Sequence, residues 1–162
     1  MPALLEVEQL AVEFDSDLGK LRAVDDVSFT VEAGETVGLV GESGCGKSVT
    51  ALSVMRLLPW PMGGIAAGRI RFDGQDLVDL ESSAMENIRG AEIGMVFQEP
   101  MTALNPVQPI GKQIGEALLL HYSLDESEAL RRSLEILERV GIPSPKLRLG
   151  EYPHQQIGRA HV

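Results

Sequence analysis

The chain has 162 residues, and its 14 Lys and Arg residues against 24 Asp and Glu residues give a formal net charge of −10. This length allows one domain with a real core but few residues for a second. An acidic chain without a basic cluster argues against nucleic acid as a partner and against direct binding to anionic lipid, so any phosphate site must be built locally.

The first ten residues, MPALLEVEQL, lack the basic start and long apolar run of a signal peptide. No stretch of the sequence reaches the roughly 18 apolar residues of a membrane helix. We therefore expect any membrane role to depend on a partner. Cys45 is the only cysteine, which excludes an internal disulfide and fits a reducing compartment.

Strands are predicted on both sides of a turn at Gly34. Residues 4–14 alternate partly between apolar and polar types, and residues 23–35 form a second strand-like run that ends at this turn. The next run, TVGLV at residues 36–40, is wholly apolar. This run is typical of a parallel strand buried on both faces.

Beyond residue 46 the pattern becomes helical. We predict a helix over residues 47–58 that Pro59 and Pro61 bring to an end, because proline cannot continue a helix. Residues 59–68, PWPMGGIAAG, are expected to form a flexible connection. A strand followed by a turn is predicted at residues 68–77, and another apolar strand at residues 91–98.

Two helices are predicted in the last third of the chain. The first covers residues 110–121 and the second residues 123–140, where Ser123 and Glu126 have the spacing of a capping box. Gly141 and Pro143 should end the second helix. Its apolar stripe is interpreted as ordinary core packing and consists of Leu130, Leu134, Leu137 and Val140.

The stretch GESGCGKS at residues 41–48 matches the phosphate-binding pattern G-x-x-x-x-G-K-[ST]. Glycines let successive backbone N–H groups converge on one anion, and the helix that begins here adds its positive dipole end. Lys47 can reach the outer phosphates, and the Ser48 hydroxyl can bind Mg²⁺. The predicted nucleotide-binding loop consists of Gly41, Glu42, Ser43, Gly44, Cys45, Gly46, Lys47 and Ser48. At Cys45 the backbone N–H is expected to matter more than the thiol.

The segments VDDVSFTVEAGETVGLVGESGCGKS and MVFQEPMTALNPV resemble the ATP-binding subunits of ABC transporters, and FQEPMTALNP and YPHQ resemble the oligopeptide, dipeptide and nickel permease branch. The resemblance covers residues 4–155, although Glu99 and Ala103 stand where the family often has Asp and Ser. It implies that Gln98 is a catalytic glutamine that also binds Mg²⁺, alongside Lys47, and that Phe14 stacks on adenine. Phe14 could instead be a core residue at a strand end.

In that family, YPHQ is followed by signature glycines, an apolar strand ending in Asp-Glu, and a switch histidine, none of which occurs in this sequence. We therefore expect residues 1–162 neither to hydrolyse ATP nor to fold stably alone. Residues 157–162, IGRAHV, are interpreted as a non-native tail translated from sequencing-adapter DNA, and the alternative is a naturally truncated relative.

The predicted fold is therefore an α/β P-loop NTPase of the ABC type, with an antiparallel β subdomain and a partial helical subdomain, and with the C-terminal part of the core sheet missing. Residues 1–156 would be a partial ATP-binding domain, in which residues 1–98 form the β subdomain and P-loop core and residues 99–156 the helical part.

The resemblance implies an ATP hydrolase that drives peptide import, with ATP as substrate and Mg²⁺ as cofactor. Its partners would be transmembrane permease subunits, a second ATP-binding subunit and, indirectly, an extracytoplasmic substrate-binding protein. It would lie peripherally at the cytoplasmic face of the membrane. Alternatives are an importer of nickel or another small solute, a soluble ABC-type ATPase, and a P-loop kinase or GTPase. The sequence lacks the N-K-x-D pattern of guanine recognition, which weakens the GTPase alternative.

Overall fold

The computed structural model describes residues 3–98 and 104–156. The chain divides into two compact units, residues 1–86 and residues 87–162, and each is considered by itself. The boundary between them falls within the short helix α2 (Ser82–Ile88). The predicted division of the chain after residue 98 stays a prediction, and the predicted tail lies outside the described residues.

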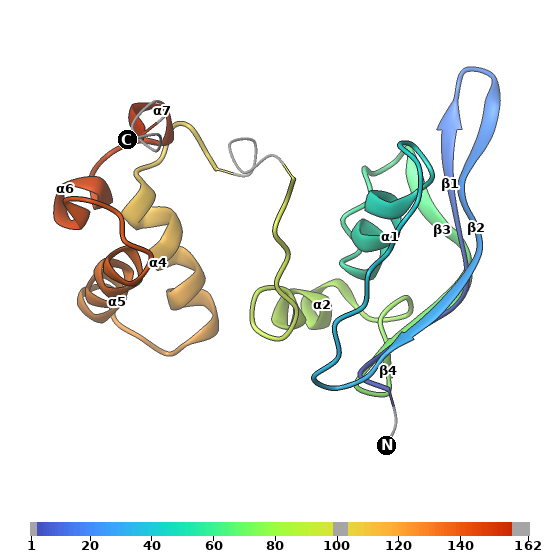
Figure 1. Cartoon of the computed structure of the whole chain (residues 1–162), viewed down its shortest axis with the longest axis horizontal. Helices are drawn as coiled ribbons and strands as arrows, with labels where there is room; N and C mark the ends of the chain where they lie inside the picture. Colours follow the sequence, from blue (N-terminus) through green and yellow to red (C-terminus); the bar gives the residue numbers. More distant parts are fainter. Residues whose placement is uncertain (1–2, 99–103, 157–162) are drawn as a thin grey trace. The chain divides into compact units, whose positions relative to one another are not determined.

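The first unit is built on an antiparallel sheet with the strand order β2-β1-β3-β4 (Figure 1). The strands are β1 (Leu5–Ser16), β2 (Gly19–Val31), β3 (Gly63–Phe72) and the two-residue β4 (Gln75–Asp76). The predicted strands at the N-terminus are thus confirmed. Gly34 adopts a φ of 79° in the turn after β2, a conformation that costs glycine little.

Helix α1 (Lys47–Val54) packs against β1 and β2 (Figure 1). It buries Thr50, Ser53 and Val54, and the Ser53 hydroxyl is satisfied because it donates to the carbonyl of Val49 at 2.7 Å. The fully buried apolar side chains of this unit are contributed by the sheet and by the segment after it: Val7, Leu10, Val12, Ile70, Leu77 and Met85.

A bulge interrupts the ladder between β1 and β2. Val12 pairs with Val24, whereas the next residue, Glu13, pairs with Arg22. Ala23 is therefore an extra residue in β2 that has no partner in β1. Such bulges are frequent next to binding sites, because the extra residue turns its backbone in a new direction.

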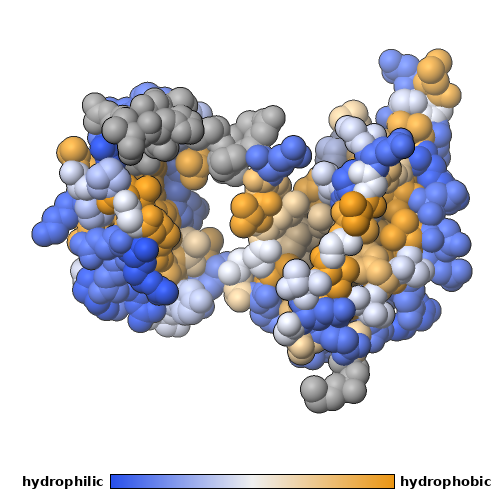
Figure 2. Space-filling view, viewed as in Figure 1, coloured by the Kyte–Doolittle hydropathy of each residue, from blue (hydrophilic) through white to orange (hydrophobic). Residues whose placement is uncertain are grey.

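Three predictions for the first unit are wrong in part. Residues 36–40 form no strand, and Val40 is 92% exposed, because no described strand lies beside this run to complete a ladder. Apolar surface of this unit is visible in Figure 2. Helix α1 ends at Val54 rather than at residue 58, since Arg56 takes a left-handed φ of 49°. The expected flexible connection is strand from Gly63 onward, because these residues pair with β1.

The second unit is helical and contains α4 (Ile110–His121), α5 (Glu126–Arg139), α6 (Pro145–Leu149) and α7 (Pro153–Gln156). Helices α4, α5 and α6 pack on one another. Gly115 of α4 faces α5, where a methyl group would make ordinary van der Waals contacts, 4.0 Å from Ala129 Cβ and 3.8 Å from Ser133 Oγ.

Small residues at this interface explain why the predicted leucine stripe of α5 is wrong in part. The buried face consists of Ala129, Ser133 and Leu137, whereas Leu130 is 54% and Val140 66% exposed. The residues of α5 that lie against Gly115 are the small Ala129 and Ser133, and Leu137 is the member of the predicted stripe that is buried.

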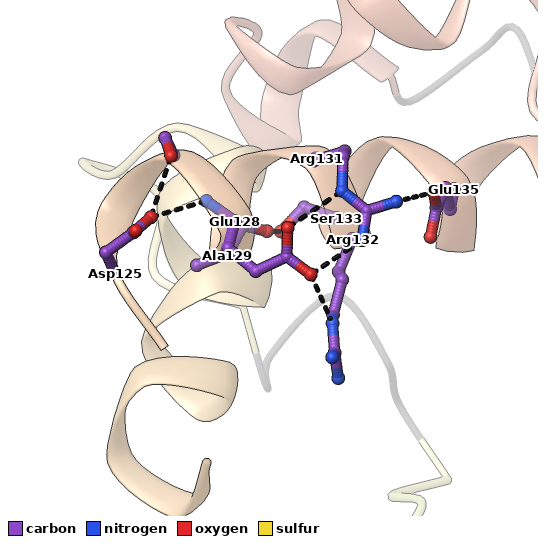
Figure 3. A network of polar contacts seen from close by, with 8 residues as sticks. Asp125, Glu128, Ala129, Arg131, Arg132, Ser133 and Glu135 are labelled. Carbon is purple, nitrogen blue, oxygen red and sulfur yellow. Dashed lines mark hydrogen bonds and ion pairs between the residues drawn. The ribbon is translucent and has the colours of Figure 1, made fainter. Parts of the chain in front are cut away.

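The predicted N-cap of this helix is also wrong. Helix α5 begins at Glu126, and the Asp125 carboxylate caps it by accepting from the backbone N–H of Glu128 at 2.8 Å (Figure 3). That hydrogen bond and one from the Ser127 hydroxyl lower the pKa of Asp125. Ser123 lies two residues outside the cap.

Residues 91–98 form no strand, in contrast to the prediction. A single bridge joins Arg89 to Ile93, and Gly90 closes the turn by donating to the Ile93 carbonyl at 3.0 Å. The His121 ring packs over Gly90, with its Nε2 atom 2.8 Å from the position of a methyl group there. Among the described residues, no helix is long and apolar enough to cross a membrane.

Candidate nucleotide site

Residues 41–46 form a loop that leads into α1, whose first two residues are Lys47 and Ser48. Its last glycine, Gly46, adopts a φ of 90°, in the left-handed region. A methyl group on Gly46 would lie 2.6 Å from the carbonyl oxygen of Ala23 and 3.2 Å from Val24 Cγ2. The loop therefore rests on Ala23, the bulge residue of β2, and only glycine fits at position 46.

The ammonium group of Lys47 lies inside this loop. It donates to the carbonyl oxygens of Gly41 at 2.8 Å and Glu42 at 2.5 Å, and it lies 3.5 Å from the sulfur of Cys45. These contacts join the first residue of α1 to the start of the loop. The Lys47 cation is thereby held among the backbone groups of the loop that the motif predicts to bind phosphate.

The backbone N–H groups at the start of α1 point out of the helix, because the first turn of a helix has no intrahelical acceptors. The first turn of α1 contains no acidic residue, so the positive end of the helix dipole is not neutralised there. Thr50 satisfies the Gly46 carbonyl through both its N–H at 2.8 Å and its hydroxyl at 3.0 Å. The N–H of Cys45 instead donates within the loop to the Glu42 carbonyl at 3.3 Å.

Oxygen donors for Mg²⁺ are few at this loop. Ser48 is exposed in the first turn of α1, and its hydroxyl makes no hydrogen bond to the described part of the chain. No group of three or more His, Cys, Asp or Glu side chains among the described residues could hold a metal. This donor set suits Mg²⁺, which is commonly bound through one or two protein oxygens together with substrate phosphates.

Phe14 lies in β1, directly opposite Leu21 of β2 and Gly63 of β3. Its side chain is half-buried. Val12 pairs with Val24, next to the Ala23 carbonyl that Gly46 approaches. Phe14 is two residues further along β1, about 7 Å at the rise of a strand. The register thus brings the predicted base-stacking residue close to the predicted phosphate loop.

Gln98 is exposed and follows a stretch without regular structure in the second unit. Its predicted contact with Mg²⁺ and water stays a prediction. The YPHQ motif begins α7, where the rings of Tyr152 and His154 stack with centroids 5.8 Å apart and Gln155 accepts from the Tyr152 N–H at 2.9 Å.

Two contributors to the site were not predicted from the sequence. Ala23 provides the contact for Gly46, and Gly63 makes room for the Phe14 ring. Nothing in the composition around Ala23 indicates a bulge, because its position depends on the pairing register. The Gly-Gly pair at residues 63–64 was a usable signal, since glycine in a strand often marks a close approach of another group.

Residues 24–157 match the family described as "ABC transporter". This match covers more than half of the chain, and the chain belongs to the ABC transporter family. The predicted α/β fold of the ABC type is thereby confirmed.

Within this family, the chain is similar to peptide-transport proteins. It is 48% identical over 155 residues to the oligopeptide transport ATP-binding protein OppD of Bacillus subtilis (strain 168). It is 52% identical over 155 residues to a putative peptide import ATP-binding protein of Brucella melitensis biotype 1. These matches include 96% of this chain but 43% and 46% of the two relatives, so the chain spans about half their length.

Solved structures of ABC cassettes share the fold. The dimeric structure of MJ0796, a bacterial ABC transporter cassette, has a TM-score of 0.80 at 22% identity and covers 95% of this chain and 63% of that chain. A post-hydrolysis state of the same cassette, bound to ADP and Pi, has a TM-score of 0.79.

Proposed function

We propose that this chain is the nucleotide-binding part of the ATP-binding subunit of a peptide importer. The observation that carries the proposal is the loop geometry. The Lys47 ammonium group lies within 2.8 Å of two loop carbonyls, and the loop is seated on β2 through Gly46. An anion that enters this loop would meet a cation, a helix N-terminus and glycine backbone at the same place.

The phosphates of ATP would bind along residues 41–48, with Lys47 neutralising the outer charges. Backbone N–H groups at the start of α1 would hold the remaining oxygens. The base would stack on Phe14, since every base has a π-face and an aromatic ring accepts it without specific hydrogen bonds. The short spacing between Phe14 and the residues that contact Gly46 supports one nucleotide bridging both.

Mg²⁺ fits this loop with the Ser48 hydroxyl as a protein ligand. A role of Gln98 as a second ligand is proposed from the family resemblance alone. When bound, the ion would neutralise phosphate charge and fix the geometry of the outer phosphates. The chain's own contribution is to present the Ser48 oxygen on the first turn of α1 and to hold the Lys47 ammonium group at the Gly41 and Glu42 carbonyls of the loop.

For the whole protein, we propose that ATP binding and hydrolysis drive the import of peptides. The names of two relatives, OppD of Bacillus subtilis and the Brucella melitensis protein, support the substrate class. The proposed partners are transmembrane permease subunits, a second ATP-binding subunit and, through the permease, an extracytoplasmic binding protein. The proposed location is the cytoplasmic face of the membrane, reached through the permease.

Equilibrium binding to the purified chain tests the nucleotide site. We expect ATP to bind in the presence of Mg²⁺ and inorganic tripolyphosphate to compete with it, because both occupy the loop. If circular dichroism shows the purified chain to be folded and neither ATP nor tripolyphosphate binds at millimolar concentration, the proposed function is wrong. Copurification with the permease subunits and with peptide-loaded binding protein then tests the transport role separately.

A further inference from the structure

The ring of Phe14 occupies the space directly above Gly63, its cross-strand partner in β3. A methyl group on Gly63 would lie 2.5 Å from Cε1, 2.8 Å from Cδ1 and 3.2 Å from Cζ of this ring. Carbon atoms in contact are normally about 3.5–4.0 Å apart. The present position of the ring therefore requires that residue 63 has no side chain.

The backbone beneath the ring is held on both sides. The Gly63 N–H donates to the Pro59 carbonyl at 2.8 Å, and the Asp15 N–H donates to the Met62 carbonyl at 2.7 Å. Gly63 is buried and Phe14 is half-buried. A side chain at position 63 would thus displace the ring, by about 1 Å, rather than the strand.

We propose that Gly63 is a positioning residue for nucleotide binding, because it sets where Phe14 presents its aromatic face to the base. This inference rests on the proposed function. Gly63 itself does not touch the nucleotide in this proposal. It acts through Phe14, whose distance from the phosphate loop is fixed by the register of β1.

The chain contains a matched control for this role. Gly64 is the next residue of the same strand, and a methyl group there would have no heavy atom within 4 Å. Neither glycine has the positive φ that penalises other residues. Gly63→Ala and Gly64→Ala therefore change the unfolded chain alike and differ only in what the new methyl group meets.

The experiment measures the dissociation constants of ATP and of tripolyphosphate, which has no base, for the full chain and its variants. We expect Gly63→Ala to weaken ATP binding about three- to tenfold, part of the stacking contribution of an aromatic residue, and to leave tripolyphosphate binding unchanged. Gly64→Ala should leave both constants unchanged. Thermal unfolding of each variant confirms that the loss is not a loss of fold.

A double-mutant cycle separates positioning from a general structural effect. In the Phe14→Ala background, Gly63→Ala should have no further effect on ATP affinity, because there is no ring left to displace. Unchanged ATP affinity in Gly63→Ala, equal losses for both probes, or additive effects in the cycle would each overturn the proposal. If the unaltered chain binds tripolyphosphate but Phe14→Ala binds ATP normally, base stacking on Phe14 is excluded while the phosphate site stands.

Discussion

The carbonyl oxygen of Ala23 lies so close to Gly46 that a methyl group on Gly46 would stand 2.6 Å from it. Ala23 is the extra residue of the β2 bulge, and Gly46 is the last residue before α1. The loop that carries Lys47 is thus seated on the sheet through backbone atoms. This contact supports the loop from the side of the sheet, in addition to the Lys47 hydrogen bonds that close it.

Substitution of Gly46 tests this contact. Gly46→Ala combines an unfavourable φ of 90° with a clash against backbone, so we expect a loss of about 3 kcal/mol or more in unfolding free energy. Gly44→Ala is the matched control, because Gly44 has a φ of 82° with no heavy atom near the new methyl group. That variant should lose only about 1–2 kcal/mol. Equal losses in chemical denaturation would show that the Ala23 contact is unimportant.

Removal of the Lys47 ammonium group should weaken binding of both ATP and tripolyphosphate. Lys47→Ala deletes the one charged group whose hydrogen bonds close the loop, and a charged hydrogen-bonding partner contributes about 1.5–3 kcal/mol. We expect at least a tenfold higher dissociation constant for both probes by calorimetry. Lys112→Ala, an exposed lysine on α4, is the control and should bind normally. Normal affinity in Lys47→Ala would refute the phosphate assignment.

Acid should weaken the second unit through Glu128. Hydrogen bonds from Arg131 and then Arg132 lower the pKa of Glu128 from 4.5 to about 2 (Figure 3). Because the folded-state pKa is the lower one, the stabilisation is complete above about pH 4.5 and is lost as the pH falls toward 2. In Glu128→Gln, the melting temperature should fall less steeply over this range than in the unaltered chain.

The control for Glu128 is Glu138→Gln on the same helix. Glu138 forms no ion pair with any described residue, so its variant should keep the acid dependence of the unaltered chain. An identical pH profile for Glu128→Gln and the unaltered chain would show that the Arg131 and Arg132 contacts do not persist in solution.

The apolar run at residues 36–40 should cause self-association. Val40 is 92% exposed and Leu39 48% exposed, next to backbone that no described strand pairs. Unpaired apolar segments of this kind favour pairing with another chain. Sedimentation velocity should show association of the unaltered chain that Val40→Lys reduces. Leu18→Lys makes the same exchange at the fully exposed hairpin tip and should have a smaller effect.

The parts of the fold that local sequence determines were predicted correctly. Lys47 begins a helix as the loop motif requires, and the first strand and α4 lie where their apolar patterns indicate. The predicted start of α5 is wrong because Ser123 and Asp125 are both residues that commonly cap helices, and the sequence alone does not choose between them. The strand predicted at residues 36–40 is absent because a buried strand needs adjacent strands to pair with, and a local apolar run does not show whether such strands are present.

The site was predictable where it follows from one continuous motif and unpredictable where it depends on register. Residues 41–48 carry their own signal, and Phe14 came from family resemblance. Ala23 and Gly63 have roles only because of the residues that they face in adjacent strands. If the strands paired one residue out of register, other residues would face Gly46 and Phe14. The sequence alone does not determine the pairing register to one residue.

The bulge at Ala23 also has a consequence for changes in chain length, which the β1–β2 hairpin should tolerate at its tip but not at the bulge. Deleting Ala23 would remove the register shift between Val12 and Glu13, so this end of the ladder would gain regularity while the loop lost its contact with the sheet. Insertions beside Leu18 would lengthen the hairpin only beyond Phe14 and leave the spacing from Phe14 to Gly46 unchanged. Length variation among natural variants should therefore concentrate at the tip and spare the strand between Leu21 and Val24.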